Sequence, residues 1–173
     1  MKTVSMEMPE LKELLLRPPR MTLAVAESMT CGQVQARIGA ISGASEFFLG
    51  GLTAYSPGQK ARHLGVDPAV AAAVNGVSAA VAEQMARGAC ALFGSDLALA
   101  TTGYAEPSAE WRADSPFAWW ALAHAQAGGK FTVRSGRIEG RGLARVAAQE
   151  FVAARALAEL VAYLRAWRAA PAG

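Results

Sequence analysis

Ser28 is one of two side chains whose type and position could support nucleophilic chemistry. It lies in residues 26–32, where a short apolar run at 22–26 passes into a stretch with helical spacing. Ligand sites of open α/β sheets lie beyond the carboxyl ends of strands, and helix-start N–H groups there can hold an anion or a developing oxyanion. The segment therefore predicts a nucleophile at Ser28. The alternative is that Ser28 or Thr30 only caps the helix.

Lys60 is the candidate base, because the sequence has no convincing Ser/His/Asp pattern and its only histidines are His63 and His124. Lowering a lysine pKa from about 10.4 to near 7 costs about 4 kcal/mol and requires burial in a tight pocket. Glycines nearby in the sequence, at 50, 51 and 58, would permit such packing. The alternative is that Lys60 is a solvated residue on a short helix.

A third polar segment, 101–107, follows an apolar strand expected over Leu97–Ala100. It would lie at the same sheet edge as Ser28, where hydroxyls and backbone amides could contact a ligand phosphate. A turn without a ligand explains the same residues equally well.

Hydrophobic periodicity and turn residues predict the elements that would position these side chains. Strands are expected at 22–26, 47–55, 96–100, 117–123 and 131–134, the last two as a hairpin around Gly128 and Gly129. Helices are expected at 8–17, 32–41, 57–63, 79–93 and from 143 to about 167. The last of these has an apolar stripe that consists of Val146, Ala147, Phe151, Ala154, Leu157, Ala158, Val161 and Leu164. This order predicts an α/β fold, a three-layer α/β/α sandwich with a mixed, mostly parallel sheet.

The chain of 173 residues and 18.0 kDa fits one domain, and 53% apolar with 18% charged residues excludes intrinsic disorder. We expect a helical extension at 1–19, the domain at 20–168 and a flexible tail at 169–173. No apolar run approaches the about 20 residues of a membrane span, and the first residues do not resemble a secretory signal, so we expect a cytoplasmic protein. Cys31 and Cys90 lack metal or redox spacing and are expected to be free thiols.

A net charge of +3 is too small to indicate nucleic-acid binding. The basic cluster Arg134, Arg137, Arg141 and Arg145 is expected to be a solvated edge, with a phosphate clamp as the alternative. Abundant alanine and tryptophan favour a homo-oligomer.

Four motifs occur in order along the chain: Ala-Glu-Ser-x-Thr-x-Gly at 26–32, Gly-Ala-Ser-x-Phe-Phe-x-Gly-Gly at 43–51, Ala-Tyr-Ser-x-x-x-Lys at 54–60 and Thr-Gly-x-Ala-x-Pro at 102–107. Together they resemble the motifs of the CinA C-terminal domain family. Their order and spacing match over about residues 20–107, and the final helix fits less specifically to about 167. The resemblance implies an α/β/α domain and, for active members, hydrolysis of nicotinamide mononucleotide to nicotinate mononucleotide and ammonia.

The resemblance also implies roles for individual residues. Ser28 would be the nucleophile and Lys60 its base, with Tyr55 as a further catalytic-site residue. Substrate-binding residues would be Thr30, Gly32, Thr102, Gly103 and Arg141. The implied mechanism uses no metal and no cofactor, and the implied partner is a small nucleotide-like substrate rather than nucleic acid or a membrane.

The departures from the family pattern lie at the expected site. Met29 and Cys31 replace a cysteine and a glycine, while Tyr104 and Glu106 replace an isoleucine and a glycine. A carboxylate at Glu106 would repel a phosphate. A second hypothesis is therefore a catalytically impaired homologue that binds a different small ligand or a protein partner.

Overall fold

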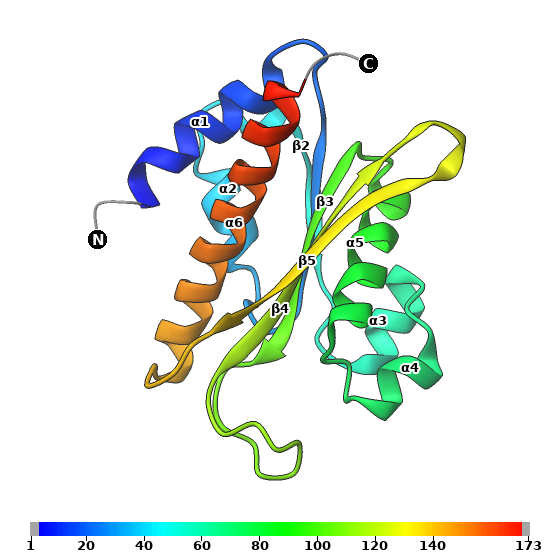
Figure 1. Cartoon of the computed structure of the whole chain (residues 1–173), viewed down its shortest axis with the longest axis vertical. Helices are drawn as coiled ribbons and strands as arrows, with labels where there is room; N and C mark the ends of the chain where they lie inside the picture. The colour runs from blue at the N-terminus through cyan, green and yellow to red at the C-terminus, as the bar shows by residue number, and fades with distance from the viewer. Residues whose placement is uncertain (1–3, 171–173) are drawn as a thin grey trace.

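The computed structural model describes residues 4–170, which build one five-stranded sheet between two layers of helices (Figure 1). The strands are β1 (Leu23–Glu27), β2 (Phe48–Thr53), β3 (Leu97–Tyr104), β4 (Phe117–Ala125) and β5 (Phe131–Glu139). Their order is β2-β1-β3-β4-β5; β1 pairs in parallel with β2 and β3, and β4 pairs antiparallel with β3 and β5. The mixed sheet and the predicted hairpin are confirmed.

Helices cover both faces of the sheet, as predicted (Figure 1). One layer holds α1 (Val4–Leu16), α2 (Gln33–Gly39) and α6 (Arg145–Ala169), and the other holds α3 (Pro57–Leu64), α4 (Pro68–Ala73) and α5 (Ala79–Phe93). Two short 3-10 turns, η1 (Ala44–Glu46) and η2 (Ala127–Gly129), complete the elements. Within residues 4–170, none of the helices has the length and apolarity needed to cross a membrane.

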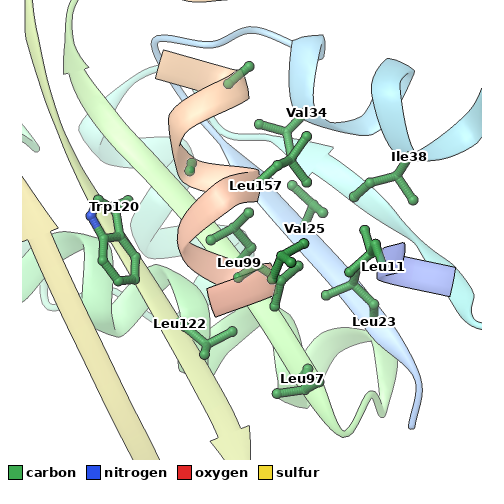
Figure 2. Packing of buried hydrophobic residues seen from close by; sticks show 14 of the residues in the cluster. Leu11, Leu23, Val25, Val34, Ile38, Leu97, Leu99, Trp120, Leu122 and Leu157 are labelled. Carbon is green, nitrogen blue, oxygen red and sulfur yellow. The ribbon is translucent and has the colours of Figure 1, made fainter. Parts of the chain in front are cut away.

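The two faces of the sheet differ in side-chain size, and this alternation sets the spacing of the layers. Leu97 and Leu99 of β3 point into the core beneath α6, whereas Ala98 and Ala100 point toward α5. Figure 2 shows the larger side, where leucines of β1 and β3 pack with Leu157 of α6. Small side chains on the other face permit a close approach of α5 to the sheet.

Helix α5 begins and ends where the sequence predicts. The Ser78 hydroxyl accepts a hydrogen bond from the N–H of Val81, and Gly94 ends the helix in the left-handed conformation. Gly88 allows α5 to touch α3, because a Cβ there would lie 1.9 Å from the Leu64 carbonyl oxygen.

Helix α1 belongs to the same hydrophobic core as the sheet. Leu11 and Leu15 are completely buried in the cluster beneath α6. The helix expected at 8–17 therefore packs against the body of the fold through these leucines. Of the tail expected at 169–173, residues 171–173 lie outside the described residues.

Two expectations about strand ends are wrong, and one about the buried face of a helix is wrong in part. The segment Thr101–Tyr104 continues strand β3 rather than forming a loop, because it pairs with Phe117–Trp120 of β4. Strand β5 likewise extends to Glu139. On α6 the predicted stripe residues Val146, Ala147 and Phe151 are exposed, whereas Leu157, Val161 and Leu164 of the same stripe are buried as predicted.

The short helix α4 was missed by the sequence analysis. Asp67 caps it by accepting hydrogen bonds from the N–H groups of Ala69 and Val70, and Pro68 takes the first helical position. An Asp-Pro pair before an alanine-rich stretch is a start signal that could have predicted it.

Candidate active site

Ser28 and Lys60 meet at the carboxyl edge of the sheet. Ser28 directly follows β1, Lys60 lies in α3 after β2, and Lys60 Nζ donates a hydrogen bond to Ser28 Oγ at 3.0 Å. Both side chains are enclosed, with Ser28 4% and Lys60 1% exposed. A hydroxyl and an amine 32 residues apart in sequence thus share one buried position.

Burial lowers the pKa of the Lys60 amine from 10.5 to about 8. Nζ also donates to the backbone oxygen of Tyr55 at 3.2 Å, and no ion pair within residues 4–170 involves Lys60. The ammonium therefore has no carboxylate partner to offset the cost of its burial. The uncharged amine, which can accept a proton from Ser28, is therefore accessible near neutral pH.

A glycine opens the space that Lys60 occupies. Gly76 has φ +68°, and a Cβ there would lie 3.1 Å from Lys60 Nζ. The hydroxyl of Thr102 donates to the Gly76 carbonyl oxygen at 2.6 Å and so fixes this segment against β3. Thr102 therefore supports the wall around the amine rather than lining the cavity.

Glu27, fully buried, occupies the start of α2. Its carboxylate accepts hydrogen bonds from the N–H groups of Gly32 and Val34 through one oxygen and of Gln35 through the other, at 2.8–3.1 Å. The expectation that these helix-start amides hold an external anion or oxyanion is wrong, because Glu27 already satisfies them. The alternative that Ser28 or Thr30 caps the helix is also wrong for the same reason.

Two other backbone N–H groups next to the nucleophile are available. Neither Met29 nor Thr30 donates its N–H to an acceptor among the described residues. The carbonyls of the two peptides are held: that of Ser28 accepts from Cys31 N–H at 3.1 Å, and that of Met29 from Gln149 Nε2 of α6 at 2.9 Å. Since a trans peptide is planar, holding each carbonyl also fixes the direction of its N–H.

The dyad opens into a cavity of about 430 Å³. Its lining residues are Ser28, Met29, Tyr55, Ser56, Pro57, Lys60, Asn75, Val77, Gly103, Tyr104, Ala105, Glu106, Pro107, Ser108 and Arg145. A volume of this size suits a small molecule.

Three polar side chains are linked along the wall of this cavity. Arg145 donates to the Tyr55 hydroxyl at 2.8 Å and to Glu106 Oε1 at 2.6 Å. Tyr55 is half exposed, and its phenol points to Arg145 while its backbone oxygen holds Lys60.

Of the other expected binding residues, one lines the cavity and three lie elsewhere. Gly103 lines it, but Thr30 and Gly32 do not: the Thr30 hydroxyl is buried 2.7 Å from that of Thr101, and Gly32 donates to Glu27. Arg141 lines a separate hollow with Arg112 and Arg137. The arginine at the dyad's cavity is instead Arg145, for which the sequence offered only membership of the basic cluster.

The substituted turn after Ser28 accommodates Cys31 in the left-handed conformation, with φ +47°. This is the conformation for which glycine is preferred, and the family pattern has a glycine at this position. The Cys31 side chain is exposed and does not line the cavity. Cys31 and Cys90 are both free thiols, as predicted, and burial raises the pKa of Cys90 to about 11. Within residues 4–170 no three His, Cys, Asp or Glu side chains gather as metal ligands.

Comparison with known proteins matches residues 7–164 to the model of the CinA C-terminal domain. A CinA-like protein of Geobacter sp. (strain M21) is 50% identical over 101 residues, 58% of this chain and 24% of that protein. One from Mycolicibacterium gilvum is 40% identical over 119 residues, 69% of this chain and 28% of that protein. The chain thus spans about a quarter of the length of these relatives.

Solved structures agree over nearly the whole chain. A CinA superfamily protein from Enterobacter cloacae has a TM-score of 0.84 at 28% identity, covering 95% of this chain and 94% of its own. The competence damage-inducible protein A from Klebsiella pneumoniae has a TM-score of 0.85 at 27% identity, covering 95% and 98%. Because the family model matches residues 7–164, which are most of the chain, the chain belongs to the CinA C-terminal domain family.

Proposed function

We propose that this protein hydrolyses the carboxamide of a nicotinamide nucleotide or a closely related pyridine amide, with Ser28 as nucleophile and Lys60 as base. The observation that carries the proposal is the buried 3.0 Å contact between Ser28 Oγ and Lys60 Nζ, beside a cavity that suits a small molecule. The family motifs around these two residues support nicotinamide mononucleotide as the first substrate to test.

The first half of the reaction forms an ester. The neutral Lys60 amine takes the proton of Ser28 Oγ as the oxygen attacks the carboxamide carbon, giving a tetrahedral intermediate. The Lys60 ammonium then gives its proton to the amide nitrogen as the C–N bond breaks, and ammonia leaves. Ser28 is left esterified by the pyridine carboxyl group.

The second half consumes water. Lys60, neutral again, takes a proton from a water molecule that attacks the ester carbon, and the Ser28–carbonyl bond breaks as the proton returns to Ser28 Oγ. The products are the pyridine carboxylic acid and ammonia. No metal and no cofactor enters this sequence.

The N–H groups of Met29 and Thr30 are the proposed donors to the oxyanion of both intermediates. They flank the nucleophile on its own loop, and their peptide planes are fixed by Cys31 and Gln149. A donor that is already oriented stabilises the developing charge without reorganisation. The helix-start amides of α2 have no part in this role, since Glu27 holds them.

The proposed partner is therefore a small nucleotide-like molecule, with neither nucleic acid nor a membrane involved, in the cytoplasm. We also propose a homo-oligomer, supported by the exposed apolar side chains of Val146 and Phe151 on α6. Light scattering of the purified protein measures its mass; a monomer at all concentrations contradicts this part.

Ammonia release from nicotinamide mononucleotide tests the proposal. The wild type should release ammonia and nicotinate mononucleotide in equal amounts, and Ser28→Ala and Lys60→Met should each lose activity by at least about a thousandfold. Ser45→Ala and Lys130→Met change an exposed serine and an exposed lysine and are the matched controls. No release by the wild type, or full activity of Ser28→Ala, would favour the second hypothesis of a binding protein without catalysis.

A further inference from the structure

The Glu106–Arg145 pair at the cavity joins segments that are far apart in the sequence. Arg145 begins α6, and Glu106 lies two residues beyond β3. Arg145 Nη1 contacts Glu106 Oε1 at 2.6 Å, while its other terminal nitrogen holds the Tyr55 hydroxyl at 2.8 Å. Both ends of the guanidinium are thus engaged by groups of the chain itself.

The charge balance of the cavity follows from its lining. Lys60, Glu106 and Arg145 are its charged members. Above the Lys60 pKa of about 8 this amine is neutral, and Glu106 and Arg145 then leave the cavity without net charge. A phosphate dianion entering it gains attraction only from an arginine that already has a carboxylate partner.

The free N–H groups of Met29 and Thr30 are assigned to the oxyanion, and side chains of the protein engage both nearby helix N-termini. The first free N–H groups of α2 donate to the Glu27 carboxylate. At α3 the Ser56 hydroxyl accepts from Gln59 N–H. When Lys60 is neutral, Arg145 is the cation among the cavity residues that can receive a phosphate, and Glu106 competes for it.

We propose that Glu106 is a specificity-determining residue that occupies Arg145 in place of a ligand phosphate. The consequence is a cavity that accepts the phosphate-free nucleoside form of a pyridine ligand nearly as well as the phosphorylated nucleotide. A phosphate must separate Arg145 from Glu106 and then lie beside a carboxylate of like charge, whereas a neutral hydroxyl leaves the pair intact. This inference rests on the proposed function, because it concerns the ligand of the same cavity.

Binding of the two acid products tests the inference without requiring turnover. Calorimetry at pH 9, where Lys60 is largely neutral, measures the dissociation constants of nicotinate mononucleotide and nicotinate riboside for the wild type and for Glu106→Gln. The wild type should prefer the nucleotide by no more than about threefold, and Glu106→Gln should raise that preference roughly tenfold by tightening the nucleotide alone. Glu106 is exposed, so the variant is expected to fold normally.

Two further variants locate the effect. Glu110→Gln removes a carboxylate from the same loop that does not line the cavity, and it should leave the preference unchanged. Glu106→Gln combined with Arg145→Gln should lose the gain, because the phosphate then has no arginine to bind. A gain in Glu110→Gln, or a gain that survives without Arg145, overturns the assignment.

The remaining outcomes separate the inference from the function. A wild type that prefers the nucleotide by about a hundredfold, or a preference that Glu106→Gln leaves unchanged, overturns the role of Glu106 while both products still bind. Failure of the wild type to bind either product contradicts the proposed function itself, and the inference falls with it.

Discussion

The pH dependence of hydrolysis follows directly from the burial of Lys60. The reaction needs the neutral amine, and burial lowers its pKa to about 8. About one tenth of the enzyme then carries the neutral base at pH 7 and about nine tenths at pH 9, so kcat/KM should rise roughly tenfold between them and level off above. A lysine with its ordinary pKa near 10.4 would give a rise of about a hundredfold with no plateau in this range.

The assay measures the initial rate of ammonia release from nicotinamide mononucleotide at constant ionic strength from pH 6 to 10. The substrate concentration is kept well below KM. Lys130→Met removes an exposed lysine and should reproduce the wild-type profile. A rate that still climbs a hundredfold from pH 7 to 9, or one that does not change with pH, would refute the role given to the buried amine.

Three further predictions concern the groups that surround the dyad. Between pH 8 and 10.5 the unfolded chain holds a proton on Lys60 that the folded chain has lost, so the stability of the folded chain rises with pH. The free energy of unfolding of the wild type, relative to that of Lys60→Met, should therefore increase by up to about 3 kcal/mol across this window. A difference between the two proteins that does not depend on pH would contradict this. Glu27→Gln replaces an acceptor of three backbone N–H bonds by an amide with one acceptor oxygen. Urea unfolding should therefore show that the free energy of unfolding falls by about 2–4 kcal/mol. A fall of less than about 0.5 kcal/mol would disprove the capping role. Gln149→Leu should lower kcat roughly tenfold with little change in KM, because it frees the Met29–Thr30 peptide; a change confined to KM would point to ligand binding instead.

The sequence predicts the layers of this fold well because local signals agree with the packing. Ser78 and Gly94 mark the ends of α5, and alternating Leu and Ala at 97–100 marks a strand buried on both faces. The buried face of α6 was harder to predict from the sequence. Alanine occurs on all sides of this helix, so the apolar pattern does not select one face, and exposed Val146 was assigned to the core.

The site was predictable only where a motif fixed both partners. Ser28 and Lys60 were recognised from two short motifs, and the parallel pairing of β1 with β2 brings the segments that follow these strands to one edge. No local signal connects Arg145 to Tyr55, because 90 residues separate them and their contact depends on how α6 crosses the sheet. The capping role of Glu27 was not predicted for another reason. A carboxylate at the end of a strand can be recognised as the cap of the next helix only when the geometry of the turn between them is known.

Trapping the ester on Ser28 shows whether this serine is the nucleophile. The wild type is mixed with nicotinamide mononucleotide, quenched in acid within a turnover, digested, and examined by mass spectrometry for the acyl group on the peptide that contains Ser28. We expect this adduct in the wild type, no adduct in Ser28→Ala and a sharply reduced amount in Lys60→Met. Ammonia release with the acyl group on a different residue, or undiminished release by Ser28→Ala, would contradict it.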